Sequence, residues 1–208
     1  LSIKVKLALL ISLIVTVILS MNIYLYYLSS QSELQAGAED QMLTIAKHIG
    51  ATLESSEKVR RYMEDMMGRT LRNAAIAAKS ELDPRVEHVT NEQLAALSVK
   101  LGVDHITLWV RTPDDIVAVK SSEPKELNLS SKTWDYWHQA LQQLFDERRV
   151  TIPQGQKLEN YWSGPIQFSS SDGDRIDKWG YYYDGTTDYI IDPYVDAPPP
   201  LMRPIEVT

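Results

Sequence analysis

Aromatic and acidic side chains gather in the second half of this 208-residue chain. All five tryptophans lie between Trp109 and Trp179, and tyrosines and aspartates are dense from Trp179 to Tyr194. Aromatic walls with a few polar groups are typical of small-molecule pockets, and ring faces beside carboxylates can hold a cation. We therefore predict a ligand-binding site made by Trp109, Trp134, Tyr136, Trp137, Tyr181, Tyr183, Asp184, Asp188 and Tyr189.

The same residues also admit a purely structural interpretation. Alternation along a strand would put Tyr181 and Tyr183 on one face and Tyr182 on the other, where the rings could fill a sheet core. Asp184 precedes a glycine, which is a strong hairpin signal, so the aspartates, including Asp192, could be turn residues. At this point both interpretations stay open.

Other chemistries find little support. The chain has no cysteine, which excludes disulfides, thiolate nucleophiles and cysteine-bound zinc. Its four histidines are scattered without metal-ligand spacing, and the polar stretch Ser169–Asp177 lacks a full calcium loop, so we interpret it as a solvated acidic loop. No nucleophile elbow or phosphate loop occurs. We expect no metal, no cofactor and no enzymatic activity.

The composition, 44% hydrophobic and 24% charged, is that of a folded protein. The net charge of −7 argues against nucleic-acid binding.

The segment Leu7–Leu28 is predicted to span a lipid bilayer. It holds no charge, proline or glycine, and its residues would cover roughly 33 Å at about 1.5 Å each. Lys4 and Lys6 precede it, which places the N-terminus in the cytoplasm and residues 29–208 outside the cell membrane. A cleaved signal peptide is the alternative, although its apolar region is normally shorter.

Residues 29–82 have no proline, and apolar residues recur at helical spacing from Leu34 to Ala78. This predicts one long membrane-proximal helix, or two helices joined near Ser55 and Ser56. The apolar stripe needs a partner, either the domain's own sheet or the same helix in a second copy, so we expect a homodimer.

The following residues, 83–196, predict an α+β domain with an antiparallel sheet flanked by helices. Residues 197–208 are proline-rich and look like the start of a continuation. The expected elements are a helix at Asn91–Lys100, strands at His105–Arg111 and Ile116–Ser121, a helix from Ser130 or Ser131 to Arg148, and strands at Asn160–Phe168, Lys178–Tyr183 and Thr187–Asp192, the last ended by Pro193.

This order of elements resembles the Cache family, the PAS-like extracytoplasmic sensor domains of bacterial chemoreceptors, sensor kinases and cyclic-di-nucleotide enzymes. The stretches Trp134–Ala140 and Trp179–Tyr194 look like the pocket helix and closing hairpin of that family. The resemblance implies an amine, amino acid or carboxylate ligand. This chain differs from amino-acid-binding members in placing Trp134 where they usually have arginine.

We therefore expect a small-molecule sensing domain of a bacterial membrane receptor that passes ligand state across the membrane through its long helix. The alternative is a dimerising structural or interaction ectodomain without a small-molecule ligand.

Overall fold

A computed structural model describes residues 2–197, apart from the side chains of 5–11, 28 and 30–40. Chain contacts divide the protein into two compact units, Leu1–Glu57 and Lys58–Thr208. The helices and strands are, in order, α1 (Ile3–Glu81), η1 (Val86–His88), α2 (Asn91–Leu101), β1 (His105–Arg111), β2 (Ile116–Ser121), η2 (Pro124–Glu126), α3 (Tyr136–Glu147), β3 (Gln156–Leu158), β4 (Tyr161–Ser163), β5 (Gln167–Phe168), β6 (Ile176–Trp179), β7 (Tyr181–Tyr182) and β8 (Ile190–Asp196).

The first unit consists of the N-terminal part of α1. Its described polar side chains bond back to the helix itself: the Thr16 hydroxyl and the Thr52 hydroxyl each donate to the carbonyl four residues earlier, at 2.8 Å. The helix is uninterrupted at Ser55 and Ser56, which decides against the two-helix alternative.

The prediction that Leu7–Leu28 spans a membrane is not supported. The segment is helical, but among the residues whose placement is described no helix is both long and apolar enough to cross a bilayer. Within this segment, the side chains of residues 7–11 and 28 lie outside the described part of the chain.

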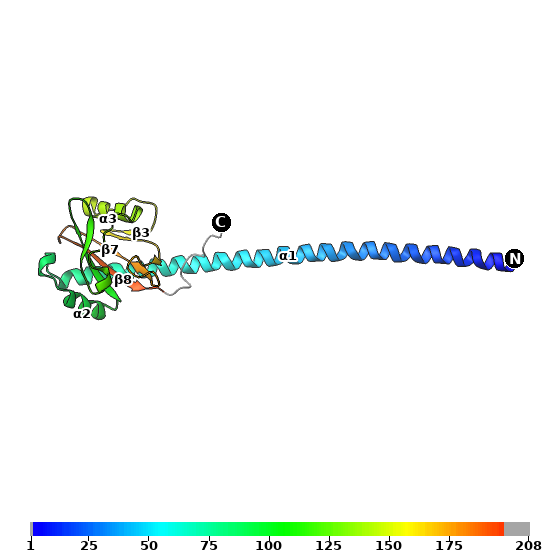
Figure 1. The fold of residues 1–208 in the computed structure, drawn as a ribbon, viewed down its shortest axis with the longest axis horizontal. Helices are drawn as coiled ribbons and strands as arrows, with labels where there is room; N and C mark the ends of the chain where they lie inside the picture. The colour runs from blue at the N-terminus through cyan, green and yellow to red at the C-terminus, as the bar shows by residue number, and fades with distance from the viewer. Residues whose placement is uncertain (1, 198–208) are drawn as a thin grey trace. The chain divides into compact units, whose positions relative to one another are not determined.

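The second unit is built on an eight-stranded sheet in which every pairing is antiparallel. The strand order is β2-β1-β8-β7-β4-β3, and β6 pairs with β8 and with β5. Strand β8 is paired along both edges, with β1 on one side and with β6 and β7 in succession on the other. Figure 1 shows β7 and β8 in this second unit. The predicted α+β class with an antiparallel sheet is confirmed.

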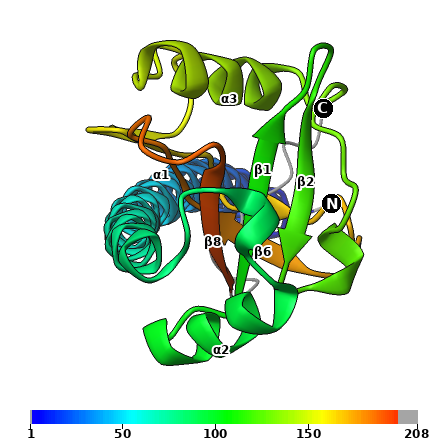
Figure 2. The same ribbon diagram turned by 90° about the vertical axis from the view of Figure 1, so that its left-hand side faces the viewer.

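Helices cover both faces of this sheet, as Figure 2 shows for α2 and α3. One core holds Leu71 of α1, Leu94 of α2 and one set of strand residues that includes Ile191. The other core holds Leu141 of α3 and the residues that point the opposite way, such as Ile190. The two-residue period of β-strands therefore sorts neighbouring residues into separate cores.

Local signals set several elements as predicted. Helix α2 begins with a capping box in which the Thr90 hydroxyl and the Gln93 amide each accept a backbone N–H. It ends at Gly102, whose φ of 68° is left-handed. The two strands that follow, β1 and β2, have the predicted bounds.

Several predicted boundaries were wrong. The strand expected at Lys178–Tyr183 begins at Ile176 and is divided at Gly180 into β6 and β7. The strand expected to stop before Pro193 continues to Asp196. Proline lacks a backbone N–H, but its carbonyl can still pair, and the Pro193 carbonyl accepts the Gly180 N–H at 3.1 Å. The strand over Asn160–Phe168 is split into β4 and β5 by Gly164 and Pro165. Helix α3 begins at Tyr136, well after the predicted serine cap.

Gly180, between β6 and β7, lets the sheet approach α1 closely. A Cβ atom at this position would lie 2.9 Å from the Leu71 Cβ and 2.9 Å from the Tyr161 Cε2, both in the buried core. We predict that Gly180→Ala lowers the free energy of unfolding by about 1–3 kcal/mol, the usual cost of overpacking a dense core. Urea denaturation measures this change.

Gly173→Ala is the matched control, since a Cβ there meets nothing within 4 Å. Equal stabilities of the two variants would contradict the close approach inferred at Gly180.

Candidate functional site

A cavity of about 320 Å³ lies between the start of α3 and the sheet. Its size is at the lower end of the range for small-molecule sites. The lining comes from η2, the turn before α3, β5 with the residues after it, and the β6–β7 segment: Glu126, Thr133, Trp134, Asp135, Tyr136, Trp137, Gln167, Ser170, Trp179 and Tyr181.

The turn before α3 directs its aromatic residues into the cavity. The Trp134 N–H donates to the Ser131 carbonyl at 2.8 Å, and the Trp137 N–H donates to the Trp134 carbonyl at 3.0 Å. Between them Asp135 takes a φ of 48°, which a non-glycine residue adopts only where its surroundings hold it. The indole rings of Trp134 and Trp137, three positions apart in the chain, thus line the same wall of the cavity.

Trp137 is the centre of the aromatic wall. Its ring lies edge-on to Trp179 at 5.6 Å and to Tyr181 at 5.9 Å, measured between centroids. Edge-to-face packing of this kind is favourable and rigid. The Trp137 indole nitrogen is buried without a hydrogen-bond partner in the described part of the chain. Its N–H is therefore an unused hydrogen-bond donor beside the cavity.

Glu126 is a buried carboxylate on the cavity wall, with only 2% of its surface exposed. Pro124 at the start of η2 and the Glu123 carboxylate, which caps the Lys125 N–H at 3.0 Å, fix the turn that carries it. Burial raises the pKa of the Glu126 carboxyl, while contacts from Ser171 and Arg175 oppose that rise.

Arg175 ties several carboxylates together beside the cavity. Its Nη2 donates to Glu126 Oε1 at 3.1 Å, and its Nε donates to Asp177 Oδ2 at 2.8 Å. A third carboxylate, that of Glu123, lies 3.6 Å from Nη1. One guanidinium shared among three carboxylates leaves this region rich in negative charge. Burial raises the pKa of Asp177 to about 6, against the lowering effect of Arg175.

Asp192 is fully buried behind the aromatic wall. The Trp109 indole N–H donates to its Oδ2 at 2.9 Å, whereas Oδ1 has no partner among the described residues. Burial raises its pKa well above the ordinary value. A buried carboxyl with one unused oxygen is costly to ionise, so burial favours its protonated form.

The structure brings four of the nine predicted site residues to the cavity: Trp134, Tyr136, Trp137 and Tyr181 line it. Trp109 stands one layer behind, packed on Trp134 at 5.2 Å between ring centroids.

The other four predicted residues do not line the cavity. Tyr183 packs against Phe145 of α3, with the two tilted rings 4.7 Å apart between centroids. The Asp184 carboxylate bonds to Lys79 of α1 and accepts from the Thr186 hydroxyl at 2.7 Å; these contacts outweigh burial and lower its pKa to about 2.

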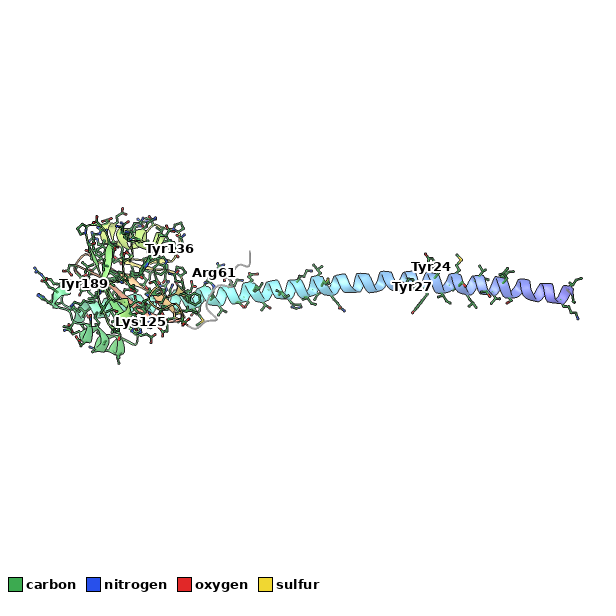
Figure 3. All side chains as sticks on the ribbon, in the orientation of Figure 1. Tyr24, Tyr27, Arg61, Lys125, Tyr136 and Tyr189 are labelled. Carbon is green, nitrogen blue, oxygen red and sulfur yellow. The ribbon has the colours of Figure 1, made fainter. Side chains whose placement is uncertain are left out.

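Asp188 and Tyr189 belong to the opposite side of the sheet. Asp188 Oδ1 accepts the Val86 N–H at 2.9 Å, and the Tyr189 hydroxyl donates to the Asp83 carbonyl at 2.6 Å. The Tyr189 ring is part of the core that contains α1 and α2; in Figure 3 it lies apart from Tyr136. For these residues the structural interpretation holds, because their polar groups bond to the segment that follows α1.

Sequence reasoning missed the charged residues of the site. The stretch interpreted as a solvated loop includes Asp177, which is fully buried, and Arg175. Lys178, next along β6, is also buried, donates to the Gly164 carbonyl at 2.5 Å, and has its pKa lowered by burial to about 8. One signal in the sequence could have placed Asp177 and Lys178 in a strand. The run Ile176–Trp179 begins and ends with an apolar residue and continues into the tyrosine-rich segment. Among the described residues no group of three or more acidic or histidine side chains could hold a metal ion.

Comparison with known proteins finds no matching family, no similar curated protein and no similar solved structure.

We predict that Asp192→Asn changes how stability depends on pH. The unfolded chain releases this proton near pH 4, whereas the folded protein holds it to higher pH, so the wild-type unfolding free energy falls as pH rises above about 4. The side-chain amide introduced by Asp192→Asn can still accept the Trp109 indole N–H but cannot ionise. The fall of the unfolding free energy with pH should therefore become shallower, by up to about 1 kcal/mol per pH unit.

Chemical denaturation at several pH values between 4 and 7 measures the slope. In the Asp192→Asn variant the unfolding free energy should still fall somewhat with rising pH, because the pKa values of Asp177 and Glu126 are raised too. Asp174→Asn, at an exposed carboxylate, should leave the slope unchanged. Identical slopes for Asp192→Asn and wild type would contradict a buried, proton-holding Asp192.

Proposed function

We propose that this chain carries the small-molecule-sensing domain of a signal-transduction receptor, and that its ligand bears a cationic group such as an amine. The observation that carries the proposal is the buried Glu126 carboxylate in the wall of an aromatic-lined cavity. Location outside a bacterial membrane stays a prediction from the resemblance to Cache domains.

Charge supports a cationic ligand. The contacts to Ser171 and Arg175 are both made by Glu126 Oε1, which leaves Oε2 for a donor from the ligand. Burying a lone charge is costly, and a charge-assisted hydrogen bond to an incoming ammonium would offset that cost. Aromatic faces next to the carboxylate would add cation–π attraction.

Geometry supports a route from ligand to helix. Trp179 and Tyr181 line the cavity, and Gly180 between them approaches Leu71 of α1 on the other face of the sheet. A ligand that moved this segment would press on α1 directly, because a dense core passes on displacements instead of absorbing them. Such coupling requires that the ligand bind two arrangements of this segment with different affinity.

The test is a binding screen of the purified chain with amines, amino acids and carboxylates, each cation paired with a neutral isostere. The tryptophans of the wall supply a fluorescence signal, and calorimetry measures affinity. We expect at least one cationic compound to bind and its neutral isostere to fail. Glu126→Gln should then weaken binding by about 10- to 100-fold, the worth of a charge-assisted hydrogen bond.

Asp174→Asn makes the same change of charge at an exposed carboxylate outside the cavity lining and should leave affinity unaltered. Binding only of anions, or equal affinity for Glu126→Gln and wild type, would refute the cationic ligand. A broad panel without any binding would favour the alternative, an interaction module that takes no small molecule.

A further inference from the structure

A second cavity adjoins the one between the start of α3 and the sheet. It has a volume of about 280 Å³, and its lining includes Glu64 of α1, Gln154 before β3, and Pro165 and Ile166 between β4 and β5. All of these residues belong to the second compact unit. The second cavity therefore lies within one body of the protein and brings α1 next to the ligand site.

Two residues line both cavities. Tyr136 is the first residue of α3 and Gln167 is the first residue of β5, and each contributes to the wall of the first cavity and to the wall of the second. Both residues are half-buried. Because solvent reaches part of each side chain, either one can turn aside without displacing the core. The two cavities can then receive a single elongated molecule.

Glu64 places a carboxylate on the wall of the second cavity, with 20% of its side chain exposed. Its Oε1 accepts from Arg60 Nη1 at 2.5 Å, which leaves Oε2 for a second donor. Lys178 also attracts Glu64 electrostatically, but its ammonium donates to the Gly164 carbonyl at 2.5 Å. Glu64 can therefore accept one further cationic donor.

The two cavities carry the same kind of acidic group. In each, a glutamate gives Oε1 to an arginine, Arg175 for Glu126 and Arg60 for Glu64, and Oε2 is left for a donor from a ligand. Aromatic and apolar side chains lie between the two glutamates. This arrangement matches a linear polyamine, whose ammonium groups form charge-assisted hydrogen bonds and are separated by methylene chains that pack on apolar walls.

We propose that the two cavities form one elongated site for a linear polyamine, with one ammonium at Glu126 and another at Glu64 of α1. The inference rests on the proposed function, because Glu126 makes the first contact in both. It adds a ligand class and a direct contact with α1. A ligand confined to the first cavity can reach that helix only through the sheet, at Gly180.

Calorimetry on the purified chain compares spermidine and spermine with n-butylamine, a monoamine that can engage Glu126 alone. Physiological salt is used, because it screens interactions between distant exposed charges. We expect at least one of the two polyamines to bind at least about tenfold tighter than n-butylamine, the worth of one further charge-assisted hydrogen bond.

Glu64→Gln should abolish this preference and leave the affinity for n-butylamine unchanged, and unchanged n-butylamine binding also shows that the variant is folded. Glu147→Gln makes the same change at an exposed carboxylate outside both linings and should keep the preference.

Gln154→Trp tests the second cavity by filling it. The Gln154 side chain is exposed, and the Trp162 indole N–H bonds to its backbone carbonyl, so the larger side chain is compatible with folding. This variant should bind the polyamines no tighter than n-butylamine.

Equal affinity of wild type for polyamines and n-butylamine, or a preference that survives either Glu64→Gln or Gln154→Trp, would overturn the elongated site and leave the cationic ligand at Glu126 standing. The absence of any amine binding, or amine binding that Glu126→Gln does not weaken, would instead refute the proposed function and this inference with it.

Discussion

The second unit depends on the pairing of β8 along both of its edges. This strand bonds to β1 on one side and to β6 and β7 on the other, and β2, β4 and β5 are each held to it through one neighbour. Because its residues alternate in direction, Ile190 and Ile191 enter different cores. Strand β8 therefore contributes to the core under α1 and α2 on one face and to the core under α3 on the other.

The buried charges follow from the same arrangement. Strand β6 pairs with the end of β8 and brings Asp177 and Arg175 against η2, where Glu126 lies. Removing several carboxylates from water is tolerated because one guanidinium bonds to more than one of them, and because burial raises the pKa of others, such as Asp192. A small core region with excess acid lowers stability if it serves structure alone, and this cost is the reason for the proposal that it binds a cationic ligand.

Helix α1 faces two different demands. Its small residues Ala74, Ala75 and Ala78 allow it to lie close on the sheet. In the sheet, Gly180 allows the same close approach, at Leu71. Nearer the N-terminus, its larger apolar residues Val59 and Met66 are exposed. The cavity beside α3 and Leu71 of α1 lie on opposite faces of the sheet.

Periodicity and capping chemistry determined the elements that depend on neighbours in the chain. The helix start at Thr90 was readable because hydrogen bonds within a few residues decide it, and the bounds of β1 were readable from its run of β-forming residues. The tertiary structure alone decided which aromatic residues meet. Tyr181 and Tyr189 look alike in the sequence, but Tyr181 packs in the core with α3, whereas Tyr189 packs in the core with α1 and α2 and donates to the Asp83 carbonyl. Glu126 and Arg175, which are far apart in the chain, became a pair for the same reason: long-range strand pairing, which no local pattern encodes, brought them together.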